Sequence, residues 1–176
     1  MASPTDGLSR PLGVLRLSLT ARCNLACPYC LPDGQEPPGL LTLEQRRVVV
    51  QAAVALGAHS LRLTGGEPLL HPQLENLIEA VQPLRAQGLR EIALTSNGTL
   101  LSASRARALR EAGLDRITLS LDGADGASVA RMAGLSDARA GERTLETLLA
   151  AIGHARDAGF DPAAGASRGD REQNAH

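Results

Sequence analysis

Short apolar runs alternate along this chain with longer amphipathic segments. The short runs are typical of strands, because apolar and polar residues alternate within them or because turn residues flank them. They cover residues 14–19, 60–64, 91–95 and 116–121. The longer segments repeat apolar residues with the period of a helix, over about residues 43–56, 72–87, 102–112 and 142–158. A strand–helix unit repeated four times predicts an α/β fold, with a parallel sheet covered by helices as an open sheet or as part of a barrel.

Residues that start, stop or bend helices support this assignment. Thr42 and Gln45 predict a capping box at the start of the helix over residues 43–56. Pro83 is expected to kink or shorten the helix over residues 72–87. In the last helix we expect the large apolar side chains to face the core, namely Leu145, Leu148, Leu149 and Ile152.

The sequence changes in character after residue 160. Residues 161–176 have no apolar periodicity and end in polar residues, so we expect one domain over residues 1–160 and a disordered or non-native tail over residues 161–176. No fifth strand then follows the last helix. An open sheet can end in this way, whereas a closed barrel cannot.

Composition narrows the class of protein. The chain has 176 residues, of which 43% are hydrophobic and 21% are charged, as in a globular domain. Its formal net charge of −1 argues against binding to nucleic acid or to an anionic membrane surface, and no apolar run is long enough to span a bilayer. Because the start of the chain lacks a basic and apolar leader, we expect a cytoplasmic protein. Tyr29 and Phe160 are the only aromatic residues, so aliphatic side chains must build the core.

Three cysteines stand within eight residues of one another, at positions 23, 27 and 30, and the chain has no other. Such a cluster in an intracellular chain indicates metal binding or redox chemistry rather than a disulfide framework. Structural zinc prefers four ligands, and no histidine stands nearby. An iron–sulfur cluster on three cysteines leaves one iron with an open position for a substrate or cofactor.

Turn-forming residues follow the other predicted strands, at Gly65-Gly66-Glu67, Ser96-Asn97 and Asp122-Gly123. Functional loops of parallel α/β folds lie at the carboxyl ends of the strands, so we expect these turns and the cysteines to converge on one rim. Each turn also has a simpler interpretation. Ser96-Asn97-Gly98 and Asp122-Gly123 are ordinary turn sequences, and Glu67 is suited to cap a turn or the start of a helix.

The run Cys23-Asn24-Leu25-Ala26-Cys27-Pro28-Tyr29-Cys30 resembles the CxxxCxxC signature of the radical S-adenosylmethionine (SAM) superfamily, and Gly65-Gly66-Glu67-Pro68 resembles its GGE motif. Further runs resemble the GTP 3′,8-cyclase family, which acts in molybdenum cofactor biosynthesis. These runs are residues 15–20, 30–34, 61–68, 95–98 and 120–122. The similarity extends from about residue 10 to residue 160. It implies that the chain forms the first four βα units of a partial (β/α)6, TIM-like radical SAM barrel, which is incomplete.

The resemblance implies a role for each matching residue. A [4Fe–4S] cluster, whose fourth iron binds SAM, would be held by Cys23, Cys27 and Cys30. Positions that contact SAM are matched by Tyr29, Gly66 and Ser120, and positions that contact GTP by Arg16, Arg62 and Thr95. Glu67 is as well suited to meet the SAM amine as to form a cap. The implied reaction is abstraction of the ribose 3′ hydrogen of GTP by a 5′-deoxyadenosyl radical, followed by attack of that carbon on C8 of guanine.

The resemblance also implies partners. SAM and GTP are the small molecules, an electron donor reduces the cluster, and cyclic pyranopterin monophosphate synthase acts next. An uncovered sheet edge predicts self-association, with a homodimer among the expected forms. The family continues for roughly as many residues again and carries a second three-cysteine cluster there, so we expect this chain to match the N-terminal portion of the family's fold.

Two other functions remain open. Another radical SAM enzyme, acting on a peptide or a cofactor, would share the cysteine and glycine motifs but not Arg16 and Arg62. A small iron–sulfur or zinc protein would hold its metal for structure or electron transfer, and the two arginines would then be ordinary surface cations. A SAM-dependent change in the cluster spectrum distinguishes the radical SAM enzymes from the third function, and GTP binding distinguishes the first from the second.

Overall fold

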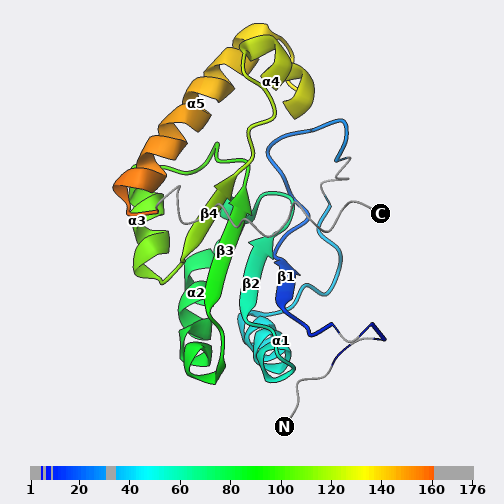
Figure 1. Ribbon diagram of the computed structural model, residues 1–176. Coiled ribbons are helices and arrows are strands. Elements are labelled where there is room, and N and C mark those ends of the chain that lie inside the picture. Colours follow the sequence, from blue (N-terminus) through cyan, green and yellow to red (C-terminus); the bar gives the residue numbers. More distant parts are fainter. Residues whose placement is uncertain (1–4, 6, 9, 31–34, 161–176) are drawn as a thin grey trace.

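Four parallel strands form the centre of the protein in a computed structural model that describes residues 5, 7–8, 10–30 and 35–160. The strands are β1 (Val14–Ser18), β2 (Ser60–Thr64), β3 (Glu91–Ser96) and β4 (Arg116–Leu119), and they lie in the order β1-β2-β3-β4 (Figure 1). Each strand therefore pairs with the next one along the chain, as successive strand–helix units commonly do. The predicted α/β fold is confirmed.

Helices connect the strands. The α-helices are α1 (Leu43–Ala55), α2 (Leu74–Val81), α3 (Ala103–Glu111), α4 (Gly126–Ala133) and α5 (Ala138–Asp157). Short 3₁₀ helices precede and follow α2, namely η1 (Pro68–Leu70) and η2 (Gln82–Gln87). The predicted capping box of Thr42 and Gln45 is present at the start of α1. Because α2 ends at Val81 and a 3₁₀ turn containing Pro83 continues the chain, this proline shortens the helix as predicted.

The segment after β4 differs from the prediction. One helix was expected over residues 142–158, whereas α4 and α5 pack against one another there and α5 begins at Ala138. Asp125 and Asp137 cap the two helices, and their carboxylates accept backbone N–H bonds at 2.8 Å from Ser128 and Ala140. The pattern did not indicate α4 because this helix is short and small residues make up most of its buried face.

The buried face of α5 is also narrower than predicted. Leu148 is buried, but Leu149 and Ile152 are 55% and 37% exposed, so the prediction for these two residues was wrong. Ala151 and Ala155 complete the buried stripe with Leu148, at the spacing of successive helical turns. Small side chains let a helix lie close to its neighbours, and the size of an apolar side chain alone does not identify such a face.

The two faces of the sheet differ in chemistry. On one face, aliphatic side chains such as Leu63 and Ile92 are fully buried in a core shared with α1, α2 and α3. The alternate positions of the same strands are mostly polar and less buried, and include Arg16, Ser18, Arg62, Thr64, Glu91, Thr95, Arg116 and Thr118. Parallel strands that helices cover on both faces are apolar throughout. The alternation therefore leaves one face of this sheet polar.

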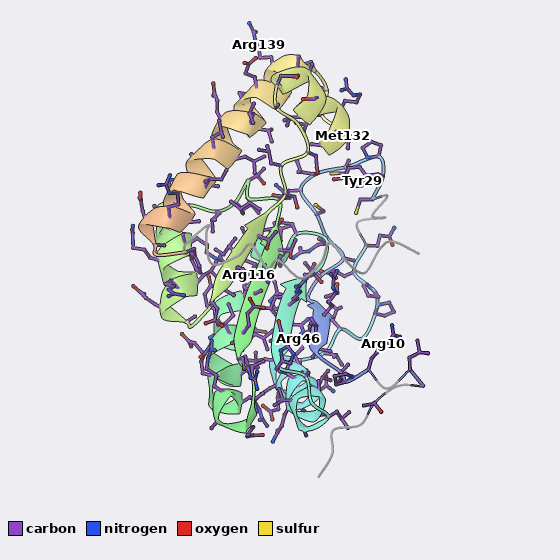
Figure 2. The ribbon with its side chains drawn as sticks, viewed as in Figure 1. Arg10, Tyr29, Arg46, Arg116, Met132 and Arg139 are labelled. Carbon is purple, nitrogen blue, oxygen red and sulfur yellow. The ribbon has the colours of Figure 1, made fainter. Side chains whose placement is uncertain are left out.

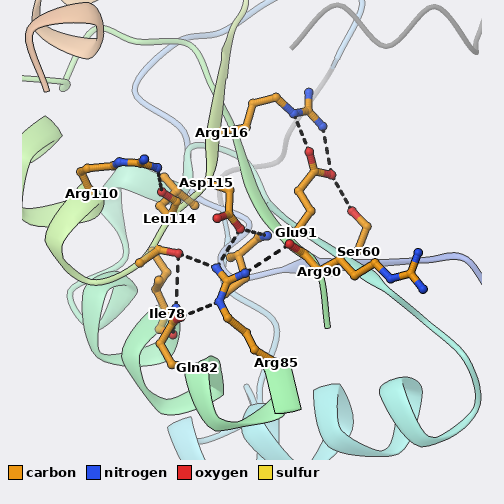
Figure 3. A network of polar contacts seen from close by, with 12 residues as sticks. Ser60, Ile78, Gln82, Arg85, Arg90, Glu91, Arg110, Leu114, Asp115 and Arg116 are labelled. Carbon is orange, nitrogen blue, oxygen red and sulfur yellow. Dashed lines mark hydrogen bonds and ion pairs between the residues drawn. The ribbon is translucent and has the colours of Figure 1, made fainter. Parts of the chain in front are cut away.

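Polar contacts join the starts of the strands (Figure 3). Arg85 of η2 donates a hydrogen bond to Asp115, next to β4, at 2.8 Å. Glu91 of β3 accepts from Arg116 Nε at 2.9 Å and from Ser60 Oγ at 2.8 Å. These bonds link η2, β2, β3 and β4 at the end of the sheet opposite to the cysteines.

No helix in the described part of the chain combines the length and apolar character needed to cross a bilayer. The predicted tail over residues 161–176 lies outside the described residues. So do residues 31–34, which belong to one of the runs that carry the family resemblance.

Candidate active site

A pocket of about 240 Å³ lies beyond the carboxyl ends of the strands. Its walls come from the cysteine loop (residues 20–30), from the turns that follow β2, β3 and β4, and from α4 and α5. The lining includes Cys23, Cys27, Cys30, Tyr29, Gly66, Thr95, Asn97, Ser120, Asp122 and Met132. Figure 2 shows Tyr29 and Met132 at this end of the molecule, above the strands. The structure thus brings the loops of the predicted rim together around one space.

The three thiols of the pocket are not joined in disulfides. Cys23 and Cys27 are half-buried and Cys30 is exposed. Burial raises the pKa of the Cys27 thiol, the neighbouring Tyr29 hydroxyl lowers it, and the charges of the other two cysteines raise it further. Three neighbouring thiolates therefore favour a positively charged partner such as iron.

The donor set fits an iron–sulfur cluster better than a single metal ion. No three His, Cys, Asp or Glu side chains of the described residues lie close enough together to hold one ion. The three cysteines nevertheless line the same pocket. Soft thiolates spread around an open space suit a group of several irons, whereas a structural zinc ion takes four ligands at one point.

Backbone contacts hold the cysteine loop against both sides of the pocket. The Glu67 N–H donates to the Arg22 carbonyl at 2.8 Å, and the Ala26 N–H donates to the Ala133 carbonyl of α4 at 3.1 Å. A Cβ atom at Gly66 would stand 2.3 Å from the Arg22 carbonyl oxygen. Glycine is therefore required at position 66 by the packing of the chain on itself, as well as by the expected approach of a ligand.

The Glu67 side chain is fully buried and is used as a cap. Its Oε1 accepts from the Leu69 N–H at 2.9 Å and from Ser96 Oγ at 2.8 Å, and its Oε2 accepts from the Asn97 N–H at 2.7 Å. Burial raises the pKa of Glu67, and these three hydrogen bonds lower it in part. The contacts favour the capping interpretation over a SAM contact, because both carboxylate oxygens already accept hydrogen bonds that tie the turn after β2 to the carboxyl end of β3.

Tyr29 joins the cysteine loop to the turn after β4. Its hydroxyl donates to Asp122 Oδ2 at 2.6 Å, and this hydrogen bond is the main reason that the pKa of Tyr29 is raised. Tyr29 is 60% exposed. Asp122 therefore holds the Tyr29 hydroxyl at the wall of the pocket while most of the residue stays exposed.

A buried cation supports the strand that leads into the cysteine loop. Arg46 of α1 is only 4% exposed, and its Nη2 donates to the Leu19 carbonyl at 3.1 Å. Its Nη1 lies 2.6 Å from His71 Nε2. Burial and the Arg46 charge lower the pKa of His71. Sequence analysis assigned no role to either residue, and their contacts are structural.

The predicted site residues fall into two groups. Those assigned to the cluster and to SAM line the pocket, together with Thr95. Arg16 and Arg62 do not line it, but stand on the polar face of the sheet, two residues before Ser18 and Thr64. The predicted position of Asn97 and Asp122 on the rim is confirmed, but sequence analysis assigned neither residue a role beyond its turn. It missed Met132 because it missed α4.

Arg16 and Arg62 are direct neighbours in the register of β1 and β2. The same row continues through Ala93 to Arg116 of β4. Arg116 is paired with Glu91, whereas the Arg62 Nε is buried without a hydrogen-bond partner among the described residues. Like charges at opposed positions repel each other. The row therefore offers cationic donors to an anion.

A family model for the radical SAM superfamily matches residues 17–168, which include the three cysteines and Gly66. The chain belongs to the radical SAM superfamily. Membership implies a [4Fe–4S] cluster and SAM as cofactors. In this radical SAM chain, the thiols around the pocket are the residues that fit the cluster.

Similar curated proteins are named GTP 3′,8-cyclase. One, from Parasynechococcus marenigrum (strain WH8102), is 60% identical over 166 residues, which are 91% of this chain and 48% of the relative. Another, from Aquifex aeolicus (strain VF5), is 49% identical over 121 residues, which are 66% of this chain and 37% of the relative. The chain spans about half the length of the first of these relatives.

Solved radical SAM structures share the fold. Streptococcus suis SuiB bound to precursor peptide SuiA superposes with a TM-score of 0.68 at 19% identity, over 86% of this chain and 31% of that chain. Native anSMEcpe with bound AdoMet superposes with a TM-score of 0.59 at 26% identity, over 81% of this chain and 42% of that chain. The four strands and their helices thus correspond to part of a radical SAM barrel.

Proposed function

We propose that this chain provides the SAM-cleaving part of a GTP 3′,8-cyclase, an enzyme of molybdenum cofactor biosynthesis. The observation that carries the proposal is a single pocket lined by three thiols and by Gly66 and Ser120 from the opposite rim. The 60% identity to a relative named GTP 3′,8-cyclase supports this activity over that of other radical SAM enzymes. Its partners would be an electron donor, which reduces the cluster, and cyclic pyranopterin monophosphate synthase, which acts next on the product.

The cofactors would occupy the two sides of the pocket. One [4Fe–4S] cluster would be held by three thiolates, those of Cys23, Cys27 and Cys30. When bound, it would supply the electron that cleaves SAM to methionine and a 5′-deoxyadenosyl radical. Tyr29, Gly66 and Ser120 would orient SAM, and the apolar wall formed by α4 and α5 would exclude water from the radical.

The substrate would place its triphosphate on the paired arginines. Planar guanidinium groups donate several hydrogen bonds to phosphate oxygens, and the unpartnered Arg62 Nε supports an anion at this position. A polyphosphate would also offset the repulsion between Arg16 and Arg62. Thr95, which lines the pocket, would contact GTP beyond the arginines, so that the ribose 3′ hydrogen faces the site of the radical. Attack of C3′ on C8 of guanine would follow.

The test is the production of 5′-deoxyadenosine by the chain after anaerobic reconstitution with iron and sulfide and reduction. We expect production that rises with GTP. Arg16→Gln and Arg62→Gln should each raise the GTP concentration for half-maximal effect by about tenfold or more, because each removes charge-assisted hydrogen bonds. The matched control is Arg107→Gln, at an exposed position of α3, which should leave this concentration unchanged.

Two outcomes contradict the proposal. Production that is indifferent to GTP would indicate a radical SAM enzyme with another substrate. A chain that assembles no cluster and cleaves no SAM would indicate a non-functional fragment or a zinc protein.

A further inference from the structure

Asn97 presents its side-chain amide to the sulfur of Cys23. The residue directly follows β3, and its Nδ2 lies 3.8 Å from Cys23 Sγ, within reach of an N–H···S hydrogen bond. The same sulfur accepts the backbone N–H of Leu25 at 3.5 Å. A turn sequence such as Ser96-Asn97-Gly98 requires no amide that faces a thiol, so the turn does not by itself explain this contact.

The orientation of the Asn97 amide is fixed by its neighbours. Its Oδ1 accepts the backbone N–H of Thr99 at 3.0 Å and the Thr99 hydroxyl at 2.7 Å. Because a backbone N–H can only donate, the oxygen and not the nitrogen must face Thr99. Nδ2 is thereby directed to the other side, where it meets Cys23 and, at 2.9 Å, Asn24 Oδ1.

Two further bonds hold this arrangement. Asn24 Nδ2 donates to Thr99 Oγ1 at 2.7 Å, which closes a ring of three polar side chains. The Asn97 backbone N–H donates to the buried Glu67 carboxylate at 2.7 Å. The amide is therefore preorganised before any ligand binds.

We propose that Asn97 is a positioning residue for the cluster ligand Cys23, which holds the sulfur and stabilises negative charge on it. The inference rests on the proposed function, because it requires a cluster on Cys23. Hydrogen bonds to cluster sulfurs help to set reduction potentials, since the reduced cluster carries one more negative charge than the oxidised cluster. Asn97 thus favours the reduced state, which must form before SAM is cleaved.

The test is a redox titration of the reconstituted full chain in the absence of SAM and GTP. Visible absorbance and EPR monitor the oxidation state of the cluster. Asn97→Leu removes the donor and keeps a similar volume. We expect the ratio of reduced to oxidised cluster at a fixed potential to fall by about 3- to 10-fold, the equivalent of one ordinary hydrogen bond. Asn97→Asp keeps the oxygen that faces Thr99 but turns a second oxygen to the sulfur. The ratio of reduced to oxidised cluster should therefore fall further in this variant than in Asn97→Leu.

Thr99→Val is the matched control. It removes the hydroxyl from the ring, but the Thr99 backbone N–H still orients the Asn97 amide, and the hydroxyl does not contact the sulfur. The midpoint potential should therefore stay unchanged. If Thr99→Val shifts the potential as much as Asn97→Leu does, the ring has only a structural role and the inference is wrong.

Pulsed EPR of protein labelled with ¹⁵N-asparagine gives a second readout. The reduced wild-type cluster should show a ¹⁵N coupling that Asn97→Leu removes, and a ¹⁵N coupling spectrum that is unchanged in this variant would overturn the inference. A cluster with unchanged potential in both Asn97 variants would overturn the inference alone. A wild-type chain that assembles no cluster would overturn the proposed function together with it.

Discussion

Replacement of Glu67 by glutamine is expected to lower the stability of the fold, although it removes a buried charge. The two carboxylate oxygens accept three hydrogen bonds, from Leu69, Ser96 and Asn97. Glutamine offers one oxygen and one NH₂ group. If the oxygen keeps the bonds from Leu69 and Ser96, the NH₂ group must face the Asn97 N–H, and two donors oppose each other.

Two effects of this substitution have opposite signs. Removal of the charge relieves the desolvation that raises the pKa of Glu67. Against this, an unpaired buried N–H costs about 1–3 kcal/mol, and the two remaining hydrogen bonds lose a charged acceptor. The losses are expected to outweigh the relief, because glutamine leaves one of the three donors unpaired at a site that is closed to water. We therefore expect Glu67→Gln to lower the free energy of unfolding by about 2 kcal/mol and the melting temperature by about 4–8 °C.

Urea unfolding of the apoprotein, followed by far-ultraviolet circular dichroism at pH 7, measures this loss. The control is Glu79→Gln, at an exposed position of α2, which should change stability by less than about 0.5 kcal/mol. A Glu67→Gln variant as stable as the wild type would refute the argument that the unpaired donor costs more than the removal of the buried charge gains.

The pH dependence tests the burial of Glu67 separately. Because its pKa is raised in the folded protein, its contribution to stability is fully present below the usual value of 4.5 and is lost as pH rises through the raised value. Glutamine does not titrate. The difference in stability between wild type and Glu67→Gln should therefore grow as the pH falls from 7 towards 4.5. A difference that shrinks over this range would show that the pKa of Glu67 is not raised in the folded protein.

The remaining predictions concern an ion pair and a tight turn. The hydrogen bond from Arg116 chiefly lowers the pKa of Glu91, so Glu91 stabilises the fold above its usual value of 4.5 and loses this contribution as pH falls through the lowered value. Glu91→Gln should therefore lower the free energy of unfolding by up to about 1 kcal/mol at pH 7 and leave it unchanged in acid. Urea unfolding that gave an equal loss at both pH values would contradict this prediction. Gly134 has φ +68°, and a Cβ added there would lie 2.1 Å from the Ala26 carbonyl oxygen. Gly134→Ala should therefore lower the free energy of unfolding by at least about 1–2 kcal/mol and reduce iron uptake by the cysteine loop. Gly153→Ala, where nothing lies within 4 Å of the added Cβ, should instead stabilise α5 in the same thermal and iron assays.

The sequence was sufficient to predict the strands and most of the helices, because each has a strong local signal. Alternation within each strand and the capping box at Thr42 do not depend on distant contacts. The signal failed at α4, whose buried positions are largely glycine and alanine. Their burial results from the close packing of α4 on α5, which is a tertiary effect that no local periodicity reports.

The candidate site was predictable in its residue types but not in its hydrogen bonds. Cysteine spacing and the position of loops after strands indicated the rim. The role of Glu67 remained ambiguous, because its partners Ser96 and Asn97 are about thirty residues away in the chain. For the same reason Asn97 resembled an ordinary turn residue until its contact with Cys23 was known.

The register of the sheet links the fold to the chemistry. The pairing that places Leu61 and Leu63 in the core also turns Arg16 and Arg62 to the polar face as neighbours. Two residues of a strand span about 6–7 Å, so the arginine row stands at this distance before the threonines that line the pocket. A slip of one residue would exchange the faces and bury both guanidinium groups among leucines. Selection for a packed core therefore also fixes how far an anion held by the arginines lies from the thiols.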